Sequence, residues 1–376
     1  MNPSPLIGVA GLMRLALTGM PLQALVDRAA TNPDPADMMM GLSCVFQLFG
    51  KKDESLEMQK KALHFRRIFT LRCENPKRRL LVLMKEGDMQ DNTPVDFLVS
   101  ETDLLLFYSS DEFLLPEAMP EHDSLFVAMG ESSDSVDLLK KVSKNLENWP
   151  KPVLNRPERI LETARDNACR LLSPIEGLFV PHTEKISRNS LSSKSFPFIA
   201  RPVDSHAGRN LERFETQEEV ENYLSRMDEE IFYASSYVDY RSRDGFYRKY
   251  RIAMVKGKPY PCHLAINHSW MVSYRNSEME KSIEKRAEEA EFMTEFSFGK
   301  RHSRALERIF ERIGLDYFVI DCGEFEGKLL LFEVDNRAFV HDMDPPEFFP
   351  YKKPAMQKLF SAFESMLDQA PPNTCF

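Results

Sequence analysis

The sequence predicts an α+β fold in three successive parts, and three patterns along the chain support this. Apolar residues recur at helical spacing up to about residue 72, strand-like runs alternate with helices over 73–155, and apolar runs paired across glycine turns are frequent in 156–376. A chain of 376 residues is longer than one ordinary core usually grows. We therefore expect a helical segment, a small α/β domain and a larger α+β domain with these boundaries.

Composition narrows the class of protein. Hydrophobic residues make up 43% of the chain and charged residues 28%, which is typical of a globular protein. The net charge of −9, without a basic block, argues against a nucleic-acid partner, and no apolar run approaches the roughly 20 residues of a membrane span. The six cysteines are scattered without a CxxC pair, so we expect reduced thiols and a cytoplasmic location.

The first 72 residues are predicted to be helical throughout. Residues 34–69 indicate two helices separated by Gly50–Asp53, a pattern that resembles a single tetratricopeptide unit. One such unit cannot bury both its faces. It is expected to dock on the rest of the chain, on a second copy or on a protein partner, or else to offer a peptide-binding groove.

The 73–155 region reads as a mostly parallel sheet with helices. The predicted elements are strands at 79–84, 103–108, 124–129 and 151–155, with helices beginning at Pro94 and at Ser135. Ligands collect at the carboxyl ends of such strands. Asp88, just after the first strand, is therefore a candidate substrate residue, although Gly87-Asp88 is equally explained as a turn.

The last part alternates helices, strands and hairpins. Its predicted elements are a helix at 157–172, strands at 196–203 and 231–238, a helix at 216–224, a hairpin of 247–255 with 260–266, and helices at 277–298, 302–313 and 353–367. The loop 204–210 contains Gly208 and suits a lid that closes over phosphate, so 182–238 is the predicted lid. Arg248 and Lys249 are explained as solvated rim residues, whereas Arg251 among apolar neighbours is expected to pair with an anion.

The stretch 315–337 carries the strongest chemical signal. Two apolar runs flank a polar connection, and a loop of about three residues centred near Gly327 would place Asp321 opposite Glu333, with Asp335 on the same face. Three carboxylates on one face repel each other unless a cation compensates them. Oxygen ligands of this kind suit Mg²⁺ or Mn²⁺.

From Lys151 to Leu367 the order of elements resembles the ATP-grasp superfamily, including its glutathione synthetase-like and ribosomal-protein-modifying ligases. The stretches that carry the resemblance are Asn155-Arg156-Pro157, Phe198–Pro202 with the His206–Gly208 loop, Tyr233–Val238, Tyr250-Arg251 with the Gly257 turn, and Leu315–Tyr317 leading to Asp321 and Phe332–Asp335. The preceding α/β domain matches the usual companion of that fold. The helical front end resembles a bacterial subgroup in which a tetratricopeptide-like segment precedes the enzyme.

The resemblance implies ATP with Mg²⁺ or Mn²⁺ as cofactors and assigns roles to particular residues. Asp321, Glu333 and Asp335 would hold the metal, with Asp335 standing where family members usually have asparagine. Arg251 and Arg201 would act on the phosphates, and Arg251 would contact the acyl-phosphate. The remaining nucleotide contacts would come from His206, Gly208, Tyr237, Val238, Asp239 and Lys249.

The resemblance also implies a function, a carboxylate–amine ligase that consumes ATP, forms ADP and acts on an amino acid or peptide through an acyl-phosphate. Candidate substrate residues are Asp88, His263, His268, Asn336 and Arg337. Two departures stand out, because the family places one lysine early in the linker helix and one in the strand before the glycine loop. This chain reads Arg165-Asp166-Asn167 and Ala200-Arg201-Pro202 there, and arginine at 201 keeps the charge. The alternative is a degenerate relative that binds nucleotide as a regulatory or adaptor protein.

Overall fold

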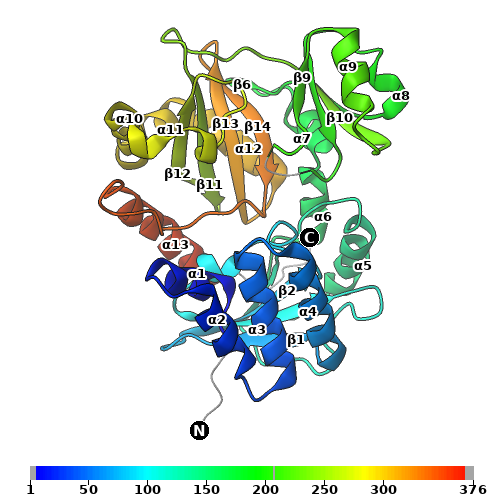
Figure 1. The fold of residues 1–376 in the computed structure, drawn as a ribbon, viewed down its shortest axis with the longest axis vertical. Coiled ribbons are helices and arrows are strands. Elements are labelled where there is room, and N and C mark those ends of the chain that lie inside the picture. The colour runs from blue at the N-terminus through cyan, green and yellow to red at the C-terminus, as the bar shows by residue number, and fades with distance from the viewer. Residues whose placement is uncertain (1–5, 206–207, 369–376) are drawn as a thin grey trace.

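The computed structural model describes residues 6–205 and 208–368, which form a mixed α+β molecule with three sheets (Figure 1). The α+β prediction is confirmed. None of the helices within these residues is both long and apolar enough to cross a membrane. The predicted site residue His206 lies outside the described residues.

The first sheet has the strand order β1-β3-β2-β4-β5. Its strands β2 to β5 are parallel and β1 runs antiparallel to β3, as expected for a mostly parallel α/β sheet. The strands are β1 (Ile68–Leu71), β2 (Arg78–Lys85), β3 (Thr102–Ser109), β4 (Ser124–Val127) and β5 (Val153–Leu154). Its helices are α1 (Val9–Leu17), α2 (Leu22–Ala30), α3 (Pro35–Leu48), α4 (Lys52–Phe65), the short 3-10 helix η1 (Val95–Phe97) and α5 (Val136–Leu146).

Helices α3 and α4 cover one face of this sheet (Figure 1). Met40 of α3 and Ala62 of α4 pack with Phe69 of β1 and Tyr108 of β3 in a single apolar cluster. Docking on the rest of the chain, one of the alternatives for the helical segment, is therefore what these helices do. The expectation of helix throughout 1–72 is wrong at 68–71, where the apolar run Ile-Phe-Thr-Leu pairs with β3 as an edge strand.

The second sheet, β7-β10-β8-β9, is small and antiparallel and stands to one side of the others (Figure 1). It comprises β7 (Thr183–Ser187), β8 (Phe198–Pro202), β9 (Glu212–Phe214) and β10 (Ile231–Ser236), with α8 (Arg188–Leu191) and α9 (Gln217–Leu224). The side chain of Thr216 caps α9 in a capping box with Glu219. An aromatic cluster that includes Phe198, Phe214 and Tyr223 gives this sheet its own core.

The third sheet has the order β12-β11-β13-β14-β6 and shares a continuous core with the first. Its strands are β6 (Leu178–Phe179), β11 (Tyr247–Val255), β12 (Lys258–Asn267), β13 (Tyr317–Phe325) and β14 (Lys328–Asp335). The helices around it are α6 (Pro157–Ile160), η2 (Leu161–Thr163), α7 (Arg165–Leu172), η3 (Tyr274–Asn276), η4 (Met279–Lys281), α10 (Ile283–Thr294), α11 (Ser297–Arg301), α12 (Ser303–Ile313) and α13 (Lys352–Asp368).

Helix α13 connects the third sheet to the first. The Glu364 carboxylate accepts hydrogen bonds from the backbone N–H groups of Ser100 (2.7 Å) and Glu101 (2.9 Å) and from the Thr102 hydroxyl (2.7 Å), and it pairs with Arg78. The side chains of Glu364 and Arg78 are each only 10% exposed. A paired, fully hydrogen-bonded carboxylate therefore joins the two parts of the molecule.

Three predicted helices differ from those in the structure. The helix expected at Pro94 shrinks to η1 because the side chains that could cap it bond elsewhere, Asn92 to the backbone of Lys85 and Thr93 to the carbonyls of Ala128 and Asn336. The helix expected at 277–298 begins only at 283, after two 3-10 turns. The helix expected at 157–172 breaks at Ala164, whose backbone is extended (φ −50°, ψ 138°).

Candidate functional site

The hairpin of β13 and β14 has the predicted register, but its turn and its strand pairing differ from the prediction. Asp321 pairs with Glu333 and Val319 with Asp335, so the three carboxylates lie on one face. The turn has only two residues, Glu326 (φ 50°) and Gly327 (φ 75°), as type I′ hairpins require. The expected three-residue loop is therefore wrong, and a β-bulge next to Asp321 supplies the extra residue that restores the register.

Asp321 is held by two basic side chains from the neighbouring strand β11. Arg251 donates to both carboxylate oxygens, at 2.7 and 2.9 Å, and Lys249 Nζ lies 2.7 Å from Oδ2. Burial alone would raise the pKa of Asp321, but the charges of Arg251 and Lys249 outweigh it and hold that pKa well below its usual value. The expectation that Arg251 pairs with an anion is confirmed, whereas Lys249 is an ion-pair partner with a side chain only 22% exposed and not a solvated rim residue.

Glu333 and Asp335 are also paired. Arg165 Nη2 lies 2.5 Å from Glu333 Oε1, and Arg337 Nε lies 3.1 Å from Asp335 Oδ1. Gly130 leaves the room that Arg337 fills, since a Cβ at that position would overlap the arginine side chain. Each carboxylate of the hairpin thus has a basic partner.

Arg201 of β8 contributes a cation from the second sheet. It is buried, and its guanidinium donates only to Ser205, to Oγ at 2.8 Å and to the carbonyl oxygen. Burial, with a smaller contribution from the nearby charge of Arg165, lowers the pKa of Arg201 to about 10. Within the described residues Arg201 forms no ion pair, which leaves a buried cation compensated by neutral oxygens alone.

These side chains form one connected charge cluster. It comprises the basic residues Arg165, Arg201, Lys249, Arg251 and Arg337 and the acidic residues Asp321, Glu333 and Asp335. Electrostatic interaction with Glu333 reaches Arg201, Arg251 and Arg337, in addition to its direct partner Arg165. The cluster carries more positive than negative groups, so it is suited to an anionic ligand.

The sequence reasoning treated Arg165 as a missing lysine, and the structure gives it a place in the cluster. The break at Ala164 starts α7 afresh, and Arg165 reaches from the first turn of that helix to β14. A cation at a helix N-terminus is opposed by the helix dipole. Because the sequence predicts an unbroken helix over 157–172, it places Arg165 in mid-helix, and no local signal identifies its role.

Glu131 lies at the carboxyl end of a predicted strand, a place where the sequence predicts that ligands collect. It follows β4, and the charges that act on it come from Arg337, Asp204, Lys185 and Asp166. Burial raises the pKa of its carboxyl group. Close to Glu131, Ser133 N–H donates to Asp204 Oδ1, just after β8, at 3.0 Å.

The predicted adenine-side residues lie together at the end of β10. Arg213 stacks over the Tyr237 ring at 3.8 Å, and the Tyr237 backbone N–H donates to Pro197 O at 3.3 Å. Asp239 accepts from the Tyr247 hydroxyl at 2.8 Å and from Arg241. The Tyr237 N–H and the Asp239 carboxylate are therefore engaged within the protein.

The remaining predicted residues divide into those near the cluster and those away from it. His263 pairs in register with Arg251, and burial followed by the Arg251 charge lowers its pKa well below the usual value. Asn336 is wholly buried and its amide donates to Met129 O at 3.0 Å. His268 is exposed and stacks on Phe246, and Asp88 pairs with Lys52 at 2.8 Å beneath α4, so these two lie outside the cluster.

The loop that was predicted to act as a lid leads toward β12. Gly208 has φ +76°, and a Cβ there would lie 3.6 Å from Met271 Sδ, just beyond the end of β12. The positive φ favours glycine at this position. The loop that follows Arg201 therefore reaches across to the third sheet.

The three hairpin carboxylates do not form a ready-made metal centre. Their hard oxygens suit Mg²⁺, but the described residues contain no group of three or more His, Cys, Asp or Glu side chains placed to hold a metal ion. Each carboxylate instead neutralises a basic side chain. Metal binding at Asp321, Glu333 and Asp335 stays a prediction.

Comparison with known proteins gives no match at the level of sequence, since neither a family model nor a curated protein matches the chain. Among solved structures, the D-alanine–D-alanine ligase of Bacillus anthracis covers 78% of this chain and 97% of its own, at 13% identity and a TM-score of 0.48. VanG D-Ala:D-Ser ligase of Enterococcus faecalis covers 78% of this chain and 100% of its own, at 10% sequence identity and a TM-score of 0.47.

An ATP-grasp RimK domain protein of Sphaerobacter thermophilus covers 74% of this chain and 98% of its own, at 14% identity and a TM-score of 0.44. All three scores lie below 0.5. These similarities therefore do not indicate an activity for this chain.

Proposed function

We propose that this chain is a ligase of the ATP-grasp type, which uses ATP to join a carboxylate to an amine and releases ADP and phosphate. The observation that carries the proposal is the charge cluster, in which five basic side chains from β8, α7, β11 and the end of β14 converge on the face of one hairpin. The resemblance of the sequence from Lys151 to Leu367 to that superfamily adds to it.

The chemistry needs little more than positive charge in the right place. A carboxylate oxygen of the substrate attacks the γ-phosphorus of ATP, and ADP leaves with the bonding electrons of the broken P–O bond. The amine nitrogen then attacks the acyl carbon, and inorganic phosphate leaves with that oxygen. Both steps gather negative charge on phosphoryl oxygens, which fixed guanidinium and ammonium groups stabilise.

We assign the phosphate contacts to the basic residues according to their partners. Arg201 has only neutral acceptors and is free to exchange them for a phosphate oxygen. Arg251 keeps a backbone contact, to Phe339 O at 3.0 Å, besides its pair with Asp321. It is held by two elements at once, which suits a group that must meet the transferred phosphoryl group without moving far.

The test is ADP release over mixtures of amino acids and peptides, with and without Mg²⁺, on the wild-type protein and two variants. Arg201→Met removes the buried cation of the lid, and we expect ADP release to fall at least about 100-fold, as for loss of one charge-stabilising donor. Arg226→Met is the matched control, since Arg226 is an exposed lid arginine with a surface partner, Glu212, and its loss should leave the rate unchanged.

Isotope transfer separates ligation from its alternatives. With a carboxylate substrate labelled with ¹⁸O, one labelled oxygen should appear in the released phosphate, because that oxygen bridges the acyl-phosphate. A product that retains phosphate would indicate a phosphotransferase. ATP binding without any ADP release would favour the nucleotide-binding regulatory alternative, and absence of both binding and release would contradict the proposal.

A further inference from the structure

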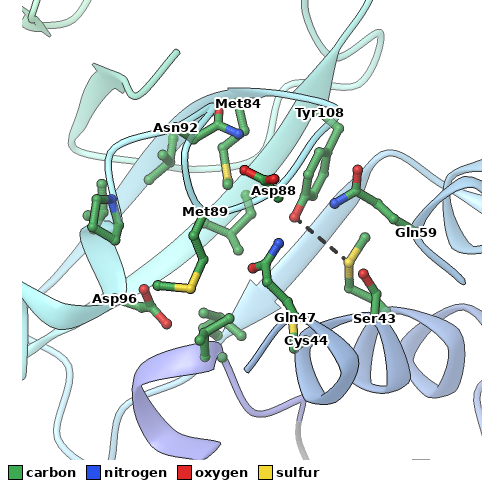
Figure 2. A pocket seen from close by; sticks show the side chains of 18 of the residues that line it. Ser43, Cys44, Gln47, Gln59, Met84, Asp88, Met89, Asn92, Asp96 and Tyr108 are labelled. Atoms are coloured by element: carbon green, nitrogen blue, oxygen red, sulfur yellow. Dashed lines mark hydrogen bonds between the residues drawn. The ribbon is translucent and has the colours of Figure 1, made fainter. Parts of the chain in front are cut away.

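A second space in the molecule lies beneath the N-terminal helices and belongs to no step of the proposed reaction. It is partly open to solvent and is lined by residues of α1, α3, α4, strands β1, β2 and β3, and the loop that follows β2 (Figure 2). Its volume is about 80 Å³. Since a cavity of about 150 Å³ can hold benzene, this one suits a ligand of about three to five non-hydrogen atoms.

The wall of the cavity is mostly apolar and rich in methionine. Met40 of α3, Met84 of β2 and Met89 of the following loop line it, together with Val82 and Leu106 from the sheet. Thioether side chains are flexible and polarizable and adapt to ligands of different shape. The wall therefore suits a short aliphatic chain.

A carboxylate stands in this apolar wall. Asp96 accepts a hydrogen bond from the N–H of Ala10 at 2.9 Å, in the first turn of α1, and forms no ion pair anywhere in the part of the chain that the structure describes. Burial raises the pKa of Asp96 above its usual value. Backbone hydrogen bonds from Val9, Ala10 and Asp96 itself partly compensate the carboxylate. A cation would stabilise it further, and residues 6–205 and 208–368 place none against it.

Two further groups border the same space as Asp96. Burial, with a smaller contribution from the charge of Asp96, raises the pKa of the Cys44 thiol to about 12, and burial also raises the pKa of the Tyr108 hydroxyl. Within the described part of the chain, the Tyr108 hydroxyl donates only to the weak acceptor Met40 Sδ, at 3.8 Å. Cys44, Asp96 and Tyr108 all line the same cavity.

Gln47 adds a second polar contact. Its side chain extends from α3 into the cavity (Figure 2), and its amide has no hydrogen-bond partner among residues 6–205 and 208–368. The Gln47 side chain is half-buried, so its amide lines the cavity and also keeps some contact with water. Its carbonyl oxygen is available to a ligand that carries several N–H donors.

We propose that this cavity binds a small aliphatic ammonium compound, whose nitrogen pairs with Asp96 and donates to Gln47 while its carbon chain lies against the methionines. An anion is excluded by the Asp96 carboxylate, and a neutral alcohol would leave that carboxylate without a counter-charge. The competing explanation is that Asp96 only caps α1 and that water fills the space.

The experiment uses the full chain labelled with ¹³C at the methionine methyl groups and titrated with n-propylammonium chloride. The signals of Met40, Met84 and Met89 should shift saturably, while those of Met254 and Met293, buried elsewhere, should not. A ligand of four non-hydrogen atoms binds no tighter than about 40 µM, so the titration extends through the millimolar range.

The variants separate binding from capping. Asp96→Asn keeps an oxygen that can accept from Ala10 but removes the charge, and it should weaken propylammonium binding at least about tenfold. Gln47→Leu provides a second variant, with a smaller loss, in case the first fails to fold. Asp137→Asn, on the exposed side of α5, is the control and should bind as the wild type does.

Three results would overturn the proposal. They are the absence of any saturable shift in the three methionine signals, equal affinity in Asp96→Asn, and binding of propan-1-ol as tight as that of propylammonium. None of these measurements involves ATP, so the proposal can fail while the proposed ligase function stands, and the reverse also holds.

Discussion

Replacing Asp321 by asparagine removes the charge at the centre of the charge cluster and should lower the free energy of unfolding. Asp321 is 5% exposed and bonds both Arg251 and Lys249, whose side chains are 20% and 22% exposed. Breaking a buried ion pair by removing one partner costs about 3–5 kcal/mol. Because both cations keep some contact with water, we expect the lower end, about 3 kcal/mol, in urea unfolding followed by circular dichroism.

The pH dependence has a defined sign. The pKa of Asp321 is depressed in the folded protein, so its contribution is fully present above the unfolded value of about 4 and is lost only as the pH falls toward the depressed folded value. The difference between wild type and Asp321→Asn should therefore be constant from pH 5 to pH 8, to within about 0.5 kcal/mol, and should shrink in acid.

A double-mutant cycle tests the reason for the loss. Arg251→Met combined with Asp321→Leu should cost less than the sum of the two single changes by about 1–3 kcal/mol, because the pair is then removed together. If Asp321→Asn costs less than about 1 kcal/mol in metal-free buffer, the ion pairs are not what holds Asp321 in place. The carboxylate would then be present mainly for a ligand.

Three further predictions concern the same framework. ATP affinity should be constant from pH 7 to pH 9 and fall as the pH passes about 10, because the pKa of Arg201 lies there; an unchanged affinity in calorimetry at pH 11 would show that this cation is not used. Glu364→Gln leaves Arg78 with only the largely exposed Asp368 as counter-charge and should cost about 2 kcal/mol in urea unfolding, so a loss below about 1 kcal/mol would contradict the packing described. Gly130→Ala places a Cβ where Arg337 lies and should lower ADP release with little change in unfolding midpoint, whereas wild-type turnover would show that Arg337 can move without consequence.

Local pattern was sufficient to predict the strands and the facing carboxylates, because side chains alternate along a strand and a hairpin fixes which residues meet. The register of Asp321 with Glu333 was predicted correctly although the loop length was not, since a bulge compensated for the shorter turn. The strand at residues 68–71 was missed. A run of four residues after a helix is too short to show whether its apolar residues repeat with the period of a strand or of a helix.

The partners of the carboxylates were beyond such reasoning. Arg165 is 168 residues from Glu333 in the sequence, and Arg251 is 70 residues from Asp321. Nothing in local spacing reports contacts at that separation. The sequence therefore indicated uncompensated acids that need a metal, whereas the fold supplies arginines and a lysine for the same purpose.

The mixture of charges in the cluster has a consequence for how a ligand must bind. Five cations packed without acids would repel each other, and the three carboxylates relieve that repulsion while no ligand is bound. A phosphate that takes over Arg165 or Arg251 releases Glu333 or Asp321, whose charge then needs a new partner. Among the described residues Arg201 forms no ion pair, so a phosphate can bind it first without displacing a carboxylate. The order of binding that follows begins at the lid and proceeds toward the hairpin, so loss of Arg201 should slow ATP association, whereas loss of Arg165 should mainly speed ATP dissociation.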